Sequence, residues 1–353
     1  MAVITVVGSG MMGTAIMYPA AENGNRVRLV GTPLDREIIE RARATGEHKT
    51  LKRRLPDGFE FYQFEELGRA LEGAELLLCG VSSFGVDWFC ENVIPVIPET
   101  LPVLSITKGM MNDGEGRMIS YPEHMRRVAE GLGKRLDISA VGGPCTSYEL
   151  ADSDPTEVAF CGWDIERLRW LKSLFETEVY HVSLSTDVRG VECAVALKNA
   201  YALAVSLAIG LSYVREGGRE LEHYNSQAAL FGQSLKEMSL LLKAFGGGED
   251  NLFLGAGDLY VTVFGGRTRR IGTLLGMGLS FEEAMSRLEG VTLESIVITG
   301  RTTKAVREGI ALGKLRAEDF PLLLHIDSLI NDGARVDIPW KKFETETLSE
   351  SCR

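Results

Sequence analysis

The sequence predicts an α/β domain built on a doubly wound, mostly parallel sheet, followed by an all-α domain. Residues 1–186 alternate short, continuous apolar runs with helical patterns. From residue 187 onward, helical periodicity dominates. The change of pattern places the predicted domains at 1–186 and 187–353.

Buried apolar runs predict the strands of the first domain. Continuous apolar strands that alternate with helices are typical of a parallel sheet covered on both faces. The runs lie at 3–8, 27–31, 74–81, 101–107 and 137–143. Two further strands, which can run antiparallel, are expected at 156–162 and 178–183, with a helix between them that starts at the N-cap Asp164.

The second domain opens with a helix that carries an amine in an apolar segment. Residues 193–211 are almost wholly apolar but include Lys198 and Asn199. A buried ammonium without partners is costly, so the segment spans a membrane, lets the amine snorkel, or faces a site that uses it. It is barely long enough to span a bilayer, and a buried helix fits better. Helices are expected at 187–212, 225–245, 269–276, 280–288, 292–308 and 321–331.

Composition narrows the class of protein. The 353 residues carry a net charge of −11, which argues against nucleic acid as a partner. The cysteines are scattered, without a CxxC pair or the spacing of a zinc site, which predicts free thiols in a reducing, cytoplasmic compartment. They are Cys79, Cys90, Cys145, Cys161, Cys193 and Cys352. The five histidines are isolated, and the sequence assigns them no chemistry.

A glycine-rich turn follows the first predicted strand. The stretch TVVGSGMMGTAIM places Gly8, Gly10 and Gly13 in the pattern G-x-G-x-x-G, between a strand and a helix. Gly8 permits the tight turn, Gly10 lets the backbone approach a diphosphate, and Gly13 lets the helix pack against the strand. This context predicts the dinucleotide-binding unit of a Rossmann domain.

The end of the second strand bears on the choice of cofactor. NAD sites commonly place an acidic residue there, on the ribose 2′-hydroxyl. Here Gly31 and Thr32 occupy the position, Asp35 follows Pro33, and Arg36 is available for a 2′-phosphate. The pattern favours NAD and leaves NADP open.

Other polar residues mark the functional edge of the sheet and an anion site. Lys108 closes the fourth apolar run, and ligands of open α/β sheets bind outside the carboxyl ends of the strands. Asp258 follows a glycine-rich bend, where we expect it to cap or begin a helix. The turn GGRTRR at 265–270 offers backbone N–H groups and guanidinium groups to an anion. A solvated loop is the alternative for both Lys108 and this turn.

Taken together, these motifs resemble the NAD(P)-dependent glycerol-3-phosphate dehydrogenases over nearly the whole chain. The resemblance rests on the order of VVGSGMMGTAI, SITKGM, VGGPCTSYEL, VALKNAYALAVSLAIGL, GAGDLYVTVFGGRTRR, LEGVTLES and FPLLLHIDSLI. It implies a Rossmann domain, a helical domain and an active site in the cleft between them. It also implies reversible reduction of dihydroxyacetone phosphate to glycerol 3-phosphate.

The resemblance further implies roles for single residues. Lys198 matches the catalytic lysine and is expected to donate a proton to the forming alkoxide, with Lys108 and Asp258 orienting the carbonyl. Asn199, Arg267 and Thr268, together with Lys108, are expected to bind the substrate. The expected cofactor contacts are Gly8, Ser9, Gly10, Met11, Met12, Gly13, Thr32, Arg267 and Glu294.

Three departures from the family pattern leave the substrate open. Thr268 stands where the family usually has asparagine, Gln233 replaces an arginine, and the connection at 212–227 is longer and more charged. A hydroxy acid, a sugar acid or another polyol phosphate is therefore an alternative substrate. A nucleotide sensor without catalysis and a methyltransferase are further alternatives, although both leave the lysines without a role. A homodimer is the default expectation for the assembly.

Overall fold

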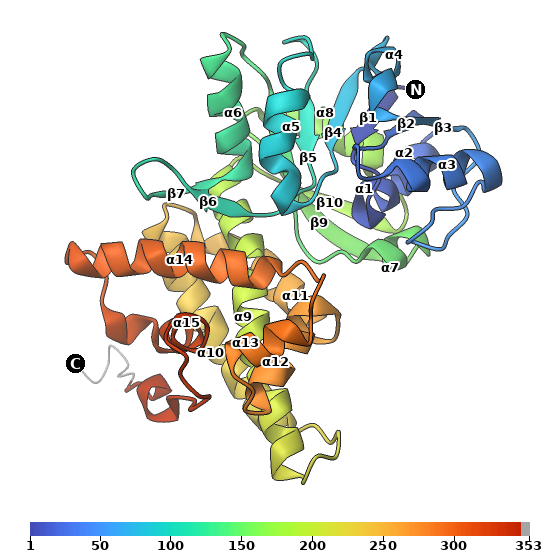
Figure 1. Cartoon of the computed structure of the whole chain (residues 1–353). Coiled ribbons are helices and arrows are strands. Elements are labelled where there is room, and N and C mark those ends of the chain that lie inside the picture. Colours follow the sequence, from blue (N-terminus) through green and yellow to red (C-terminus); the bar gives the residue numbers. More distant parts are fainter. Residues whose placement is uncertain (347–353) are drawn as a thin grey trace. The chain divides into compact units, whose positions relative to one another are not determined.

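The computed structural model describes residues 1–346 and divides into two compact units (Figure 1). Unit 1 comprises Met1–Met111, Ile119–Ala196 and Phe245–Val261. Unit 2 comprises Asn112–Met118, Leu197–Ala244 and the chain from Thr262 onward. Two helices, α9 (Val188–Arg215) and α11 (Leu252–Val263), contribute residues to both units.

Unit 1 is built on an eight-stranded sheet in the order β10-β9-β8-β5-β4-β1-β2-β3. In this order, each of the neighbouring strands β8, β5, β4, β1, β2 and β3 pairs in parallel with the next, as predicted. Strand β9 runs antiparallel to β8, and β10 is parallel to β9, so the last two strands reverse direction. The strands are β1 (Val3–Val7), β2 (Arg26–Val30), β3 (Phe59–Tyr62), β4 (Leu76–Cys79), β5 (Val103–Ser105), β8 (Ile138–Gly142), β9 (Thr156–Cys161) and β10 (Tyr180–Ser185).

Alternate residues along the strands belong to separate hydrophobic clusters on the two faces of the sheet. Ile4 and Val6 of β1 belong to one hydrophobic cluster, and Val7 belongs to the other. The first cluster includes residues of α1 (Met11–Ala15), α2 (Met17–Glu22), α3 (Arg36–Thr45), α7 (Ser147–Ala151) and α8 (Ile165–Phe175). The second includes residues of α4 (Leu67–Leu71), α5 (Val86–Asn92) and α6 (Tyr121–Gly131). Burial of both faces explains the continuous apolar runs.

Several elements differ from the sequence-based expectation. Asp258 was expected to cap or begin a helix, but it lies inside α11, where the helix continues through the predicted glycine-rich bend. Strand β3 was not predicted because it is a half-buried edge strand. The hairpin of β6 (Met110–Asn112) and β7 (Met118–Ser120) was also missed. By contrast, Asp164 caps α8 as predicted, accepting from the backbone N–H of Glu166 at 2.9 Å.

Unit 2 consists mainly of helices. They are the second part of α9, α10 (Tyr224–Ala244), α12 (Gly266–Gly276), α13 (Phe281–Ser286), α14 (Glu294–Ala311) and α15 (Pro321–Asn331). All of the predicted helices are present, with ends shifted by a few residues. The tip of the β6–β7 hairpin, Asn112–Met118, also belongs to this unit, and the Asn112 amide donates to the Arg301 carbonyl at 3.3 Å.

Close packing of α9 against α12 is made possible by glycines. A Cβ on Gly272 would lie 2.6 Å from the carbonyl oxygen of Leu203. One turn later, a Cβ on Gly276 would lie 2.2 Å from the carbonyl oxygen of Leu207. The two helices therefore touch backbone to backbone and run in the same direction along this contact.

Helix α9 is the one helix among residues 1–346 that is long and apolar enough to cross a bilayer, with a mean hydropathy of 1.6 in its most apolar window. Protein covers 83% of that window, so the helix has the burial of a core element. The described cysteines, Cys79, Cys90, Cys145, Cys161 and Cys193, are free thiols. Cys352 lies outside the described residues.

Candidate active site

The glycine turn joins β1 to α1 and forms one wall of a pocket. Gly8 adopts φ +109°, and a Cβ there would lie 2.6 Å from the backbone of Gly80. A Cβ on Gly13 would lie 2.2 Å from the carbonyl oxygen of Gly8, whereas one on Gly10 would meet no atom within 4 Å. Gly8 and Gly13 are therefore required by packing, and Gly10 keeps the backbone open to a ligand, as the dinucleotide motif requires.

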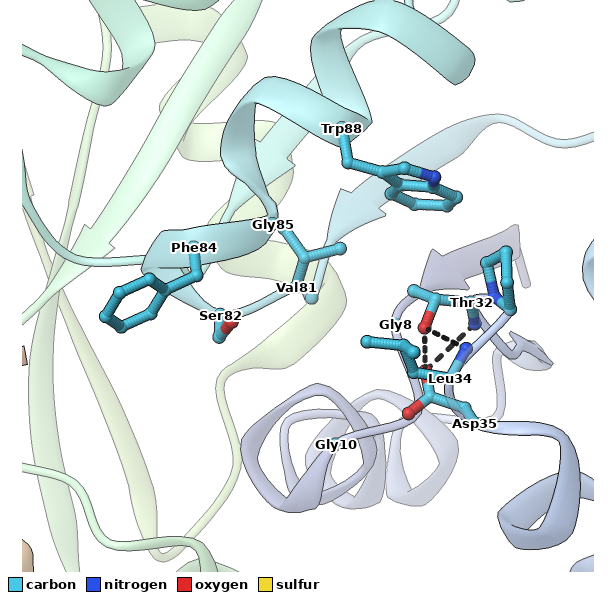
Figure 2. Close-up of a pocket in the computed structure, with 12 residues that line it drawn as sticks. Gly8, Gly10, Thr32, Leu34, Asp35, Val81, Ser82, Phe84, Gly85 and Trp88 are labelled. Carbon is cyan, nitrogen blue, oxygen red and sulfur yellow. Dashed lines mark hydrogen bonds between the residues drawn. The ribbon is translucent and has the colours of Figure 1, made fainter. Parts of the chain in front are cut away.

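The pocket has a volume of about 480 Å³ and lies beside the turns that follow β1, β2 and β4 (Figure 2). Trp88 and Phe84 lie on the side of β4 and α5, across from Thr32 and Asp35. The lining residues are Gly8, Gly10, Thr32, Pro33, Leu34, Asp35, Gly80, Val81, Ser82, Phe84, Gly85 and Trp88. Glycine backbone on one side and apolar walls on the other suit the diphosphate and the base of a dinucleotide.

Asp35 binds back onto the turn. Its Oδ2 accepts from the Thr32 backbone N–H at 2.9 Å, the Thr32 hydroxyl at 2.8 Å and the Ser9 N–H at 3.2 Å (Figure 2 shows the bonds to Thr32). The carboxylate thus ties the end of β2 to the glycine turn. Among the predicted cofactor residues, Gly8, Gly10 and Thr32 line this pocket, while Met12 lines a cavity of about 20 Å³ beside Lys108.

Lys108 and Asp258 meet in unit 1. The Lys108 Nζ lies 2.7 Å from Oδ2 of Asp258 and 2.5 Å from the carbonyl oxygen of Gly143. The Asp258 side chain is fully buried, and that of Lys108 is 19% exposed. Burial alone would lower the pKa of Lys108, but the Asp258 carboxylate outweighs it, and the pKa is raised from its usual value. The amine therefore stays charged at neutral pH.

A second buried carboxyl group lies behind Lys108. Oε2 of Glu192 accepts from the Gly109 backbone N–H at 3.3 Å, and the residue is fully buried. Burial raises the pKa of Glu192 to about 8, although the Gly109 N–H and the Lys108 charge act in the opposite direction. This glutamate was not predicted as a site residue, since its position in an apolar helix gives no hint of its contact with Gly109.

Comparison with known proteins decides the family. Residues 3–166 match the N-terminus of NAD-dependent glycerol-3-phosphate dehydrogenase, and residues 187–340 match its C-terminus. An NADP(+)-dependent glycerol-3-phosphate dehydrogenase of Archaeoglobus fulgidus is 35% identical over 289 residues, which are 81% of this chain and 84% of that relative. The chain belongs to the NAD-dependent glycerol-3-phosphate dehydrogenase family.

Further similarities agree with this assignment. A glycerol-3-phosphate dehydrogenase [NAD(P)+] of Shouchella clausii is 28% identical over 94% of this chain and 92% of its own length. The solved glycerol-3-phosphate dehydrogenase of Plasmodium falciparum has a TM-score of 0.81 at 20% identity, covering 98% of this chain and 96% of its own. That of Coxiella burnetii has a TM-score of 0.78 at 24% identity, covering 97% of both chains. The predicted fold, family and enzyme class, an NAD(P)-dependent dehydrogenase, are confirmed.

Among the other residues singled out by the resemblance to the glycerol-3-phosphate dehydrogenases, Ser9, Met11 and Gly13 belong to the glycine turn and α1 of unit 1. Unit 2 holds Lys198, Asn199, Arg267, Thr268 and Glu294. Within 191–210, every residue is buried except Lys198 and Asn199, which are half-buried. Arg267 is exposed at the start of α12, Thr268 is buried beside it, and Glu294 opens α14. The contacts of Gly272 and Gly276 hold α12 against α9, the helix that carries Lys198 and Asn199.

Two of the departures from the family pattern can now be placed. The Gln233 amide donates to Glu237 at 2.9 Å in the interior of unit 2, so this substitution changes the core. In the connection at 212–227, Glu222 forms an ion pair with Arg269 of α12. The charged connection thus supplies a counter-ion to one arginine of the predicted anion site.

Proposed function

We propose that the protein catalyses reversible hydride transfer between NAD(P)H and the C2 carbonyl of dihydroxyacetone phosphate, which yields glycerol 3-phosphate. The observation that carries this proposal is the match of both halves of the chain, 3–166 and 187–340, to one dehydrogenase family. The relative from Archaeoglobus fulgidus is named as an NADP(+)-dependent enzyme of this activity.

The cofactor belongs in the pocket of unit 1. Open space at Gly10 admits a diphosphate, and the apolar walls at Val81 and Trp88 admit a flat base, so the residues present fit a dinucleotide. When bound, the nicotinamide supplies the hydride. We assign Ser9, Met11 and Gly13 to the support of the turn, and Glu294 and Arg267 to the nicotinamide end.

Lys198 is the proposed proton donor to the alkoxide. Its half-buried position in an otherwise buried run supports a site-facing role, because such an amine is accessible to substrate yet shielded from bulk solvent. Lys108 is the proposed second amine. Its ion pair with Asp258 keeps it charged and fixed, which suits it to orient and polarise a carbonyl oxygen.

The phosphate end of the substrate is assigned to Asn199, Arg267 and Thr268. The start of α12 offers backbone N–H groups and an exposed guanidinium, and α12 packs on α9, the helix that carries Asn199. A phosphate carries the charge that such a helix start attracts. We therefore assign most of the cofactor contacts to the region 1–186 and most of the substrate contacts to the region 187–353, with Lys108, Arg267 and Glu294 as the exceptions.

We further propose that the enzyme works in the cytoplasm as a homodimer. Free thiols support a reducing compartment. Exposed Phe253 and Tyr260, seven residues apart on α11, support a self-associating surface. Analytical ultracentrifugation of the full chain measures the assembly; a monomer at micromolar concentration contradicts it.

A substrate panel tests the proposed reaction. Oxidation of NADH and of NADPH is followed by absorbance with dihydroxyacetone phosphate, other phosphorylated ketoses, and 2-oxo acids. We expect turnover with dihydroxyacetone phosphate at a kcat/KM well above that of unphosphorylated dihydroxyacetone. Turnover with 2-oxo acids alone would instead establish the hydroxy-acid alternative, and cofactor binding without any turnover would indicate a sensor.

A further inference from the structure

His48 is buried directly behind the glycine turn. It is 1% exposed, although it lies in the polar segment between α3 and β3. Backbone bonds close a small loop around it, from His48 N–H to the Arg53 carbonyl at 3.0 Å and from Lys52 N–H to the His48 carbonyl at 2.9 Å. The ring contacts the turn through Nε2, which lies 2.8 Å from the carbonyl oxygen of Ser9.

The contacts of the ring fix its tautomer. The Leu51 backbone N–H donates to Nδ1 at 2.9 Å, so Nδ1 is an acceptor and the proton sits on Nε2. Nε2–H then donates to the Ser9 carbonyl. Burial lowers the pKa of His48 from its usual value, against the opposing effects of the Ser9 carbonyl and the Asp35 charge, so the ring is neutral at pH 7.

This hydrogen bond sets the direction of the next N–H group. The peptide group between Ser9 and Gly10 is planar, and its C=O and N–H point in opposite directions. Because His48 binds the carbonyl from the interior, the Gly10 N–H faces away from His48, and Gly10 lines the pocket. The preceding peptide is also held, since Asp35 accepts the Ser9 N–H.

We propose that His48 is a positioning residue for cofactor binding: its neutral Nε2–H holds the Ser9 carbonyl so that the Gly10 N–H is presented to the dinucleotide diphosphate. The inference rests on the proposed function, because it needs a dinucleotide in this pocket. His48 does not itself line the pocket and acts through the turn. Without this bond, the Ser9–Gly10 peptide is free to rotate. The dinucleotide must then restrain that rotation when it binds, which lowers its affinity.

Substitutions at His48 separate positioning from general stability. Gln offers a side-chain N–H to Ser9 and an oxygen to Leu51, whereas Ala offers neither. Dissociation constants for NADH and NADPH are measured by fluorescence titration, and kcat and KM with dihydroxyacetone phosphate at saturating cofactor. The control is His181→Gln, at an exposed position of β10.

We expect His48→Ala to weaken binding of whichever cofactor the wild type binds by about tenfold, the equivalent of one lost hydrogen bond, with kcat at saturation nearly unchanged. His48→Gln should retain most of the affinity, and His181→Gln all of it. An unchanged dissociation constant in a folded His48→Ala protein overturns the inference. A wild type that binds neither NADH nor NADPH refutes the proposed function instead.

The pH dependence covers the case in which His48→Ala does not fold. Protonation makes Nδ1 a donor that faces the Leu51 N–H, so acid should weaken cofactor binding by the wild type once the pH falls below the lowered pKa of His48. Asp35 is the charged group that acts on the ring, and its carboxylate favours this protonation, whereas burial opposes it. The drop should be absent from His48→Gln. An identical drop in both proteins contradicts the proposal.

Discussion

The Nζ of Lys108 lies 2.7 Å from Oδ2 of Asp258, joining residues that are 150 positions apart. Lys108 follows β5, and Asp258 lies inside α11. Because the Asp258 side chain is fully buried, the ion pair with Lys108 helps to offset the cost of burying its charge. The ion pair therefore contributes to folding and at the same time fixes one of the proposed active-site amines.

Asp258→Asn is expected to lower the free energy of unfolding by about 3 kcal/mol, because it leaves a largely buried ammonium without its counter-ion. Urea unfolding measures this change. In the double variant Lys108→Met/Asp258→Leu, both charges are gone, and we expect it to be more stable than Asp258→Asn. If the double variant loses as much free energy of unfolding as the sum of the losses from the two single substitutions, the two residues are not coupled.

Glu192 should make stability depend on pH. Its pKa is raised to about 8 in the folded protein, while an unfolded glutamate titrates near about 4.3. The folded state therefore binds the proton more tightly, and its contribution to stability is complete below about pH 4.3 and lost as the pH rises to about 8. The free energy of unfolding should fall over this interval by up to about 1.4 kcal/mol per pH unit.

Glu192→Gln removes this titration. The difference in the free energy of unfolding between this variant and the wild type should be smaller at pH 6 than at pH 9. At pH 9 the variant should be the more stable protein. Glu178→Gln, at an exposed position, is the matched control. A Glu192→Gln protein with the pH slope of the wild type would contradict this account of the buried carboxyl group.

Glu237→Gln should destabilise unit 2. The Glu237 carboxylate accepts from the Gln233 amide, the Tyr201 hydroxyl and the backbone N–H groups of Leu322 and Leu323 at the start of α15. An amide presents N–H to two of these donors, which should cost about 1–3 kcal/mol in thermal or urea unfolding. Tyr201→Phe loses one bond and should cost about 1 kcal/mol. A Gln variant as stable as the wild type would contradict the requirement for a carboxyl group that accepts from all four donors.

Gly276→Ala tests the contact of α12 with α9. The added Cβ would lie 2.2 Å from the Leu207 carbonyl oxygen, so the helices must separate, at a cost of about 1–3 kcal/mol. Gly300→Ala is the control inside α14, where a Cβ meets no atom within 4 Å, and it should stabilise by up to about 1 kcal/mol. Equal effects of the two substitutions on the melting temperature would contradict the packing described here.

The sequence predicted the elements whose signals are local. The runs at 3–8 and 74–81 are strands because both faces of the sheet are buried, and the glycine turn forms the pocket that its motif predicts. The interior of α11 was missed, because glycines at 255 and 257 resemble a bend, whereas the helix runs through both of them. A Cβ on Gly257 would lie 3.1 Å from the Pro144 ring, so glycine is favoured there by packing and not by a turn.

Some tertiary contacts of the turn gave no signal in the sequence. His48 appeared isolated in the polar stretch GEHKT, and only the fold brings its ring to Ser9. Asp35 was noted as the acidic residue beyond the second strand, but its bond to the Ser9 N–H was not predicted, because it depends on how β1 and β2 end side by side. Gln233 suggested a change at the substrate, but the structure places it in the core of unit 2.

The role of Lys198 is the central claim of the proposed mechanism, and the turnover number of Lys198→Ala tests it most directly. The variant is compared with the wild type in the reduction of dihydroxyacetone phosphate at saturating NADH or NADPH, with circular dichroism and cofactor affinity confirming an intact fold. We predict that kcat falls by about 10²–10⁴-fold, as expected for the loss of a positioned proton donor. A folded, cofactor-binding variant whose kcat stays within about threefold of the wild type, far short of that loss, would contradict the account.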